Sequence, residues 1–528
     1  MERTSPTDFE RAYYYDGLQR VLLARTSTYQ YPKYTHPLQD HASYAMYPRE
    51  KKVFTTIGDH PILSIWSDKL VASIQDALDG LEWHAFYPIR IGVRGSGYGL
   101  PYRELVLMVD ITPATADWGF AISKALACRS LLRDAGIPDI EVEIREIRRG
   151  HHGASLRDFE KVIEPAYWNA SDGPGTRSMH YSYHSELYNT LVDFLPCLGH
   201  TIATEATAGT MGLYLKLAGR PSEVYGLTCR HVVMDRRESR EGMSGTWWLP
   251  DEEEYKADSD TKKHAVQRGT ERQLNDLSCL VARYKWTDRM QDDLDRGRGI
   301  IKYLEKIPPF VDEDSEKYID TRNTGHVAFM PPLEVSQRGF IRDWALIRLD
   351  LTKFPDPVVN VVPVRRSSHM RRISCENCED TCFATIQGPE SREFVPPRES
   401  IEVAKYGSAT QLQFGMTNEI EAIFRLPMSG RPKMLAREWI VIHESEKNFS
   451  QKGDSGAAVF NMDRQVVGML TGGAVNDEDS KAANRATTED GPKGFPRYKD
   501  GVDLSFVTPI QYVLEDIELV TGCRPEVV

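Results

Sequence analysis

Late in the chain stands the stretch that decides its fold: Lys452-Gly453-Asp454-Ser455-Gly456-Ala457-Ala458-Val459-Phe460. Ser455 lies between two glycines, follows an acid and precedes an apolar, β-forming run. Glycine permits a sharp turn, so the amides of Gly453 and Ser455 can converge on one oxygen. A serine hydroxyl is a poor nucleophile unless a base accepts its proton and a carboxylate orients that base. The stretch therefore predicts a nucleophile whose histidine and acid lie elsewhere.

The length and charge of the chain restrict its class. At 528 residues it exceeds what one hydrophobic core supports and predicts about two to four domains. Its formal charge is −12 and no basic tail stands out, which argues against nucleic acid as a partner. We expect neither a cofactor nor a membrane partner.

The N-terminus and the apolar runs bear on location. Met1–Pro6 has no apolar core of the kind a signal peptide needs, and no window approaches the length of a membrane span. The 8 cysteines are too few for a disulfide scaffold of this length. We therefore expect an intracellular protein, in the cytoplasm or the nucleus.

The pattern of apolar and polar residues changes along the sequence and divides the chain into four segments. Residues 56–150 show helical and strand patterns in alternation, whereas residues 195–528 are β-rich apart from an acidic stretch with helical spacing. The expected segments are an irregular lead-in (1–55), a small α/β domain with regulation as one option (56–150), a connector (151–194) and a mainly β region (195–528). Within the last, we expect a helical, acidic insertion at 237–322.

Individual elements of the α/β segment can be predicted from periodicity. Apolar residues at helical spacing predict a helix over 67–81, and a second helix over 117–134 ends at Gly136 and Pro138. Runs of β-forming residues predict strands at 89–93, 105–109 and 140–144. At the other end of the chain, Pro509 is expected to open a closing helix.

Two residues are candidates for the partners of Ser455. His231 follows the probable strand Val224–Thr228, and Asp343 heads the apolar run Trp344–Leu349. Taken alone, His231 is equally well a satisfied core histidine, and Asp343 an acid at a strand edge. A buried carboxylate is costly without a partner, so Asp343 requires one.

A cysteine cluster is a candidate for a metal site. Cys375 and Cys378 form a CxxC pair, and Cys382 follows four residues later. Zinc sites usually combine two such pairs, so free thiols on a loop are the preferred interpretation and zinc the alternative.

The order of the three candidates separates the families of serine hydrolases. No histidine follows Ser455, which excludes the order Ser, acid, His of α/β-hydrolases. The order His231, Asp343, Ser455 is that of chymotrypsin-like enzymes. Their local sequences resemble that family too: Thr228-Cys229-Arg230-His231, Asp343-Trp344-Ala345-Leu346 and Gly453-Asp454-Ser455-Gly456. The resemblance is to intracellular, disulfide-free members with an extra N-terminal domain, and it covers residues 195–528.

This resemblance implies a chymotrypsin-like double β-barrel, with the second barrel at about 395–528. Ser455 is implied to attack a peptide carbonyl, His231 to accept its proton and Asp343 to orient the imidazole. The amides of Gly453 and Ser455 are implied to form the oxyanion hole. The substrate pocket is implied to have its floor near Phe449 and its wall at Thr471-Gly472-Gly473, and the absence of an acid at the floor disfavours cleavage after Arg or Lys.

The chain departs from the secreted members of that family at Asp454. There the corresponding acid pairs with a freed N-terminus, but no basic activation site precedes residue 200 here. We therefore expect an internal partner for Asp454.

These observations predict an intracellular serine endopeptidase, with a regulatory protein as a further possible partner through residues 1–190. The alternative is a non-catalytic binding or scaffold protein on a protease fold.

Overall fold

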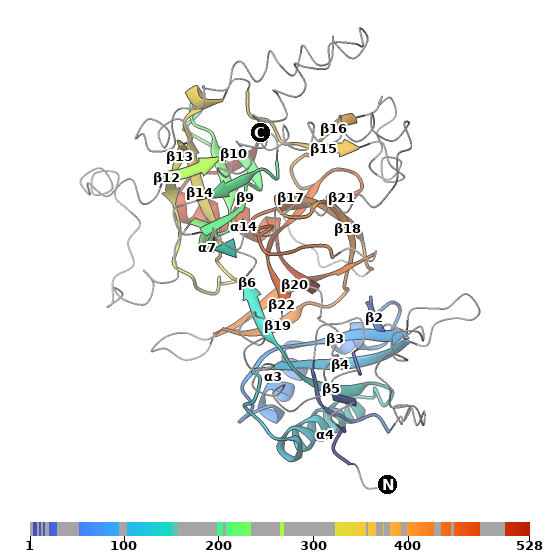
Figure 1. Cartoon of the computed structure of the whole chain (residues 1–528). Coiled ribbons are helices and arrows are strands. Elements are labelled where there is room, and N and C mark those ends of the chain that lie inside the picture. The colour runs from blue at the N-terminus through green and yellow to red at the C-terminus, as the bar shows by residue number, and fades with distance from the viewer. Residues whose placement is uncertain are drawn as a thin grey trace, which may run out of the picture.

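The structure of the protein is a computed structural model (Figure 1). It describes residues 4–7, 10–11, 14–15, 21–28, 52–93, 103–151, 154–155, 198–203, 207–233, 265–268, 323–354, 357–365, 373, 381–391, 399–426, 434–444, 448–475 and 502–528.

The C-terminal part forms a closed barrel of antiparallel strands. Its ring runs β17, β18, β20, β23, β22, β21 and back to β17, so each strand has two neighbours. Inward residues such as Val403, Val441, Val459 and Leu470 fill its interior. The strands are β17 (Glu402–Gly407), β18 (Gln411–Thr417), β20 (Met434–His443), β21 (Ala458–Asn461), β22 (Val466–Val475) and β23 (Val502–Pro509). The protein is thus mainly β, as expected.

A second sheet carries His231 and Asp343. Its strand order is β24-β10-β11-β14-β13-β12-β8-β9-β7, and its apolar core continues into α14. The strands are β7 (Ala154–Ser155), β8 (Thr201–Ala203), β9 (Thr207–Thr210), β10 (Leu213–Leu217), β11 (Tyr225–Thr228), β12 (Ala265–Arg268), β13 (Asn323–Phe329), β14 (Ala345–Leu349) and β24 (Pro525–Val527). Short elements complete the region: α7 (Arg230–Val233), the 3-10 helix η3 (Leu351–Lys353), and the paired strands β15 (Val361–Arg365) and β16 (Thr381–Thr385).

Strand β12 lies within the range 237–322, where we expected a helical insertion. It pairs with both β8 and β13, so these four residues belong to the sheet. Only Val266 among them is β-branched, which is why the strand left no clear signal in the sequence. The helices expected at 274–304 lie outside the described residues.

The N-terminal elements follow the predicted pattern closely. Ser67 and Asp117 cap α3 and α4 by accepting from Leu70 N and Phe120 N. Helix α4 crosses between β4 and β5, which pair in parallel. The elements are β1 (Val21–Arg25), β2 (Lys52–Thr55), α2 (Ile62–Ile65), α3 (Asp68–Ala77), β3 (Trp83–Val93), β4 (Arg103–Ile111), α4 (Trp118–Asp134) and β5 (Glu141–Glu146). Strands β1 and β2 lie in the lead-in that we expected to be irregular.

The N-terminal sheet is continuous with the barrel. Strand β3 pairs with β19 (Ala422–Leu426), which in turn pairs with β20 of the barrel. One apolar cluster accordingly contains residues from both parts, including Tyr87 and Met108 from the first and Phe424 and Phe506 from the second. Figure 1 shows the N-terminal elements below the barrel, with β19 and β3 at the junction.

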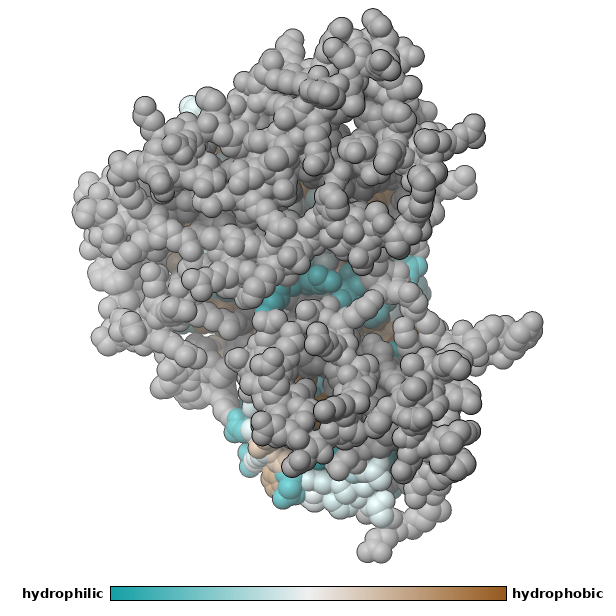
Figure 2. Space-filling view, in the orientation of Figure 1, coloured by the Kyte–Doolittle hydropathy of each residue, from teal (hydrophilic) through white to brown (hydrophobic). Residues whose placement is uncertain are grey.

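The segment expected to be a connector begins as two strands. Strand β6 (Arg148–His151) pairs with β22, and β7 pairs with β9. Figure 1 shows β6 rising from the N-terminal elements to the barrel, and Figure 2 shows a hydrophilic band at the same height on this face.

The chain closes with helix α14 (Ile510–Thr521), whose N-cap is Pro509 and whose C-cap Gly522 has a φ of 66°. Within the described residues, no helix has the length and hydropathy needed to cross a bilayer.

Candidate active site

His231 is held at the start of the sheet's helical turn. Strand β11 ends at Thr228, whose hydroxyl donates to Thr210 O at 2.8 Å, and α7 begins two residues later. The backbone amide of His231 donates to Asp343 Oδ1 at 3.1 Å. The backbone of His231 therefore holds the Asp343 carboxylate beside the imidazole of the same residue.

Asp343 is placed by the residues on either side of it. The Trp344 indole donates to Asp516 Oδ2 at 2.7 Å, and Arg342 forms an ion pair with the same carboxylate at 2.9 Å. Asp516 lies on α14, so the closing helix fixes the backbone at Asp343. With 2% of its surface exposed, Asp343 needs the partner that its sequence context required.

Ser455 lies in a tight turn before β21. Gly453 and Gly456 have φ values of 102° and 92°, which favour glycine. A Cβ at Gly456 would lie 2.4 Å from both Thr210 O and Thr228 Oγ1, so the turn packs directly on β9 and β11. Thr210 N also donates to Ser455 O at 2.9 Å.

The structure brings the three predicted residues together. His231 Nδ1 lies 2.6 Å from Asp343 Oδ2, and His231 Nε2 lies 2.8 Å from Ser455 Oγ. An ionised Asp343 only accepts, so Nδ1 carries the proton and Nε2 is left to accept from the Ser455 hydroxyl. This is the arrangement in which a serine can lose its proton to a histidine.

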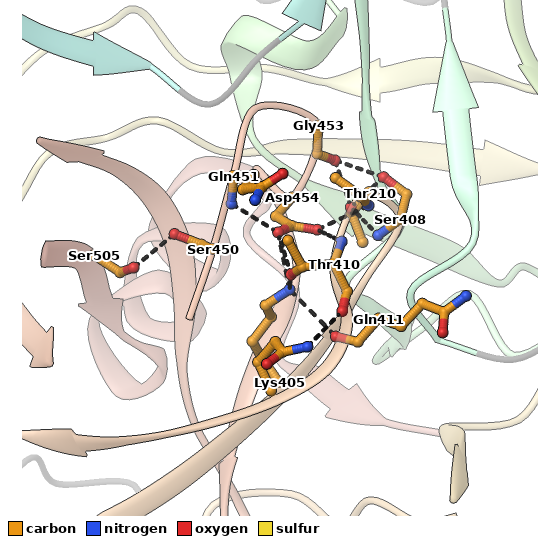
Figure 3. Close-up of polar contacts among 12 residues, drawn as sticks. Thr210, Lys405, Ser408, Thr410, Gln411, Ser450, Gln451, Gly453, Asp454 and Ser505 are labelled. Atoms are coloured by element: carbon orange, nitrogen blue, oxygen red, sulfur yellow. Dashed lines mark hydrogen bonds and ion pairs between the residues drawn. The ribbon is translucent and has the colours of Figure 1, made fainter. Parts of the chain in front are cut away.

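Asp454 has an internal partner, Lys405 on β17. The two charged groups lie 2.9 Å apart and are both fully buried (Figure 3). The Asp454 carboxylate also accepts from Ala409 N, Thr410 N, Thr410 Oγ1 and Gln451 N. Burial alone would raise the pKa of Asp454, but the Lys405 ammonium and these hydrogen bonds outweigh burial and hold the pKa below its usual value. The turn before Ser455 is therefore ordered without a freed N-terminus.

Two backbone donors flank the Ser455 hydroxyl. Within the described part of the chain, neither Gly453 N nor Ser455 N has a hydrogen-bond acceptor, whereas Asp454 N and Gly456 N donate to Gln451 O and Leu470 O. The neighbouring carbonyl of Gly453 is held by the hydroxyls of Thr210 and Ser408, at 2.7 and 2.6 Å (Figure 3).

The predicted pocket residues take different positions. Phe449 is 1% exposed and packs in the barrel's apolar cluster with Trp439 and Leu470, so its ring fills the barrel interior. Thr471 is buried, and its hydroxyl donates to Phe506 O at 3.2 Å. Gly472 and Gly473 lie on β22 opposite β6.

Sequence reasoning missed Lys405 and Glu438. Lys405 shares the inward face of β17 with Val403, and a charge in such a position signals a buried partner. Glu438 on β20 is fully buried and accepts from Thr508 Oγ1 at 3.0 Å, with Thr471 Oγ1 3.5 Å away. Glu438, Thr471 and Thr508 come from three strands that are distant in sequence, and no local sequence pattern indicates that they meet.

One group of side chains has the spacing of a metal site. Ligand atoms of Cys229, His231 and Asp343 lie within 4.8 Å of one another. Both ring nitrogens of His231 are already engaged, by Asp343 and by Ser455. Cys229 Sγ donates to Leu470 O at 3.2 Å, so all three side chains are occupied by hydrogen bonds within the protein. Cys375 and Cys378 lie outside the described residues, and the structure does not describe the side chain of Cys382 on β16.

Comparison with known proteins gives distant structural similarity only. Neither the protein-family models nor the curated proteins contain a match. One similar solved structure is a glutamic acid specific serine protease that utilizes a histidine triad in substrate binding, with 11% identity, a TM-score of 0.29, and coverage of 63% of this chain and 100% of that chain. Another is a chymotrypsin of Cellulomonas bogoriensis, with 16% identity, a TM-score of 0.21, and coverage of 39% of this chain and 76% of that chain. Both neighbours are serine proteases.

Proposed function

We propose that the protein is an intracellular serine endopeptidase that hydrolyses peptide bonds through an acyl-enzyme intermediate. The observation that carries the proposal is the position of His231, which bridges Asp343 and Ser455 at 2.6 and 2.8 Å. Surface serines and histidines do not need a buried carboxylate or two glycines at positive φ, so the presence of both around Ser455 and His231 favours a catalytic role.

In this mechanism Ser455 Oγ attacks the carbonyl carbon of a peptide bond while His231 Nε2 accepts the hydroxyl proton. Asp343 holds the imidazole tautomer and stabilises the imidazolium that forms. His231 then donates the proton to the leaving amine, and water hydrolyses the resulting ester with His231 again as the base.

The amides of Gly453 and Ser455 are proposed to bind the oxyanion. They flank the nucleophile and have no acceptor among the described residues. Donors fixed in place before the reaction stabilise developing charge without reorganisation. The ion pair between Lys405 and Asp454 supports this role because it orders the turn that carries both amides.

A substrate is proposed to bind along β22 in an extended conformation, near Thr471, Gly472 and Gly473. The two glycines have no side chains above or below the strand, which leaves room for the side chains of a peptide that pairs with its edge through the main chain. The N-terminal α/β elements are proposed to form a domain that gates this site. They connect to it through β6, which pairs with this part of β22.

The alternative function is non-catalytic binding on a protease fold. It predicts that the assembled triad has no turnover, and that substituting Ser455 leaves every activity of the protein unchanged. The distances within the triad favour catalysis.

A small activated ester tests catalysis without requiring a peptide site. The full chain should hydrolyse p-nitrophenyl acetate with a burst of about one nitrophenolate per protein, because deacylation follows a stoichiometric acylation. Ser455→Ala should lower the rate by at least about a thousandfold. Equal rates for the wild type and Ser455→Ala would contradict the proposal.

A further inference from the structure

Next to the nucleophile, one edge of strand β22 is paired with a segment of the same chain, strand β6. One edge of β22 pairs with β23. Along the other edge, β21 pairs with residues 466–469, and Leu470 exchanges hydrogen bonds with the turn of Ser455 through Gly456 N and Ala457 O. The same edge continues with β6, which pairs with Gly472–Val475. The C-terminal end of β6, at His151, is therefore the end that lies next to the nucleophile turn along this edge.

The direction of β6 leads toward Ser455. Arg148 lies opposite Val475, and His151 lies opposite Gly472, so the chain approaches Leu470 as its residue number rises. Leu470 O accepts from Gly456 N at 2.9 Å, directly after the nucleophile.

Strand β7 pairs with a different strand that also contacts the nucleophile turn, β9. Ala154 and Ser155 pair with Ala208 and Thr207 of β9. Strand β9 contacts the catalytic residues at both of its ends: Thr210 N donates to Ser455 O at 2.9 Å, and Thr207 Oγ1 donates to Val232 O at 2.6 Å, next to His231.

The two pairings are joined by very little chain. From His151 to Ala154 there are three Cα steps, which span at most about 11 Å. Residues 152 and 153 lie outside the described residues. Two strands that are this close in sequence, one paired with β22 beside Leu470 and the other with β9 beside Ser455, have the pairing expected of the two halves of an extended peptide bound at the nucleophile.

The residue that precedes β6, Ile147, is fixed to the N-terminal sheet. Ile147, between β5 and β6, is 3% exposed; its amide donates to Ile111 O at 3.0 Å, and its carbonyl accepts from His84. Strand β5 belongs to the sheet shared with the barrel. The segment is thus tethered at a high effective concentration beside its binding edges. Ser455 itself is fully buried in the full chain.

We propose that β6 (Arg148–His151) and β7 (Ala154–Ser155) occupy the protein's own peptide-binding groove, so that other peptides must displace these two strands to reach Ser455. The inference rests on the proposed function only for the role of Ser455; the strand pairing that it asserts can be measured without turnover. The ligand class of the site is an extended peptide, paired through its main chain with β22 before the nucleophile and with β9 after it.

Two prolines in β6 test the proposal. Consecutive N–H groups of a strand point to opposite sides, so Arg148→Pro/Arg149→Pro removes one donor facing β22 whichever the register. Arg148→Ala/Arg149→Ala is the matched control, because it removes the same charges and keeps both N–H groups. A second pair, Ala154→Pro/Ser155→Pro and Ala154→Ser/Ser155→Ala, applies the same contrast to β7.

Hydrogen exchange is the first readout and is independent of catalysis. In the proline variant of β6, those amides of 471–475 that point toward β6 should exchange at least about tenfold faster than in the wild type and the alanine control, whereas those that point toward β23 should not. The amides of 103–111 in β4 should not change, which shows that the variant is folded. Unchanged exchange at 471–475 in a folded proline variant overturns the proposal.

Reactivity with two reagents is the second readout. A small fluorophosphonate needs only Ser455 and His231, whereas hydrolysis of a mixed peptide library also needs the groove. The ratio of library hydrolysis to fluorophosphonate labelling should rise in the proline variants and stay at the wild-type value in the controls. Labelling with an unchanged ratio overturns the groove proposal and keeps the peptidase. If no variant is labelled, the peptidase proposal fails, and the exchange measurement alone decides whether β6 occupies β22.

Discussion

Ser455 depends on two residues from distant parts of the chain, His231 and Asp343, and the acid beside it depends on a third, Lys405. Local context indicated His231, Asp343 and Ser455 because each stands at a recognisable junction of apolar and turn residues. Lys405 carries a weaker signal, a single charge on the inward face of a strand. Glu438 and its threonine partners carry none, since their proximity results only from barrel closure.

Removing Lys405 should destabilise the protein strongly. Lys405→Met leaves the Asp454 carboxylate fully buried without its counterion, at an expected cost of about 3–5 kcal/mol in the free energy of unfolding. Lys405→Met/Asp454→Asn should recover much of this loss because no buried charge remains. Lys452→Met, a lysine substitution outside this pair, should cost less than about 0.5 kcal/mol. Denaturant titration measures all three, and a loss no greater for Lys405→Met than for Lys452→Met would refute the account of this pair.

The ion pair between Lys405 and Asp454 also predicts how the stability of the protein depends on pH. The folded-state pKa of Asp454 is held below its usual value, so its contribution to stability is present above about pH 4 and is lost as the pH falls through the folded pKa. Without Lys405 the carboxylate takes up a proton more readily. Protonation removes the uncompensated buried charge of Lys405→Met, so the stability difference between the wild type and this variant should be largest at neutral pH and should shrink as the pH falls below about 4. Lys405→Met/Asp454→Asn should show neither contribution, and denaturant titration at a series of pH values measures all three proteins.

At the level of elements, sequence patterns located long segments and missed short ones. The helices α3 and α4 have capping residues and apolar stripes, and strands β3, β4 and β5 have apolar runs, all of which are local signals. Strands β6, β7 and β12 have two to four residues and are defined by partners far away in the chain. Strand formation depends on such neighbours more than on intrinsic preference, and a sequence pattern does not contain them.

The turn between Asp454 and β21 supplies a prediction at this scale. Gly456→Ala places a Cβ about where Thr210 O and Thr228 Oγ1 lie, on a residue with a φ of 92°. Gly219→Ala is the matched control, because Gly219 has a φ of 87° and open space around its Cβ position. Gly219→Ala should cost about 1 kcal/mol from the backbone alone, and Gly456→Ala at least about 2 kcal/mol more.

Both substitutions should be compared in thermal unfolding and in ester hydrolysis. Gly456→Ala should also lower the rate, since it displaces Ser455, while Gly219→Ala should not. Equal losses of stability in the two variants would show that the turn does not pack against β9 and β11 as described.

At the level of the whole molecule, the N-terminal part is joined to the barrel by a shared sheet. The sequence predicts separate segments at 56–150 and 195–528, because the first alternates helical and strand patterns and the second is β-rich. The pairing of β3 with β19 and the common apolar cluster could not be predicted, since an edge strand leaves no mark of the partner it receives.

This arrangement predicts that the barrel region does not fold well alone. A fragment of residues 198–528 would expose the barrel's side of the common cluster, including Phe424, Ile440 and Phe506. Each such side chain contributes about 1.5–3 kcal/mol when buried, against a total stability of about 5–15 kcal/mol. The fragment should aggregate or lose its cooperative transition in calorimetry. A soluble fragment with the melting temperature of the full chain would contradict the shared core.

The central claim is that the triad makes Ser455 nucleophilic, and one measurement addresses it directly. The full chain is treated with a fluorophosphonate at neutral pH, digested, and mapped by mass spectrometry for the modified residue. We predict a single adduct, at Ser455, that is absent from His231→Ala and from protein unfolded before treatment. No adduct at Ser455 in the folded wild-type protein, or equal labelling of folded and unfolded chains, would contradict the account.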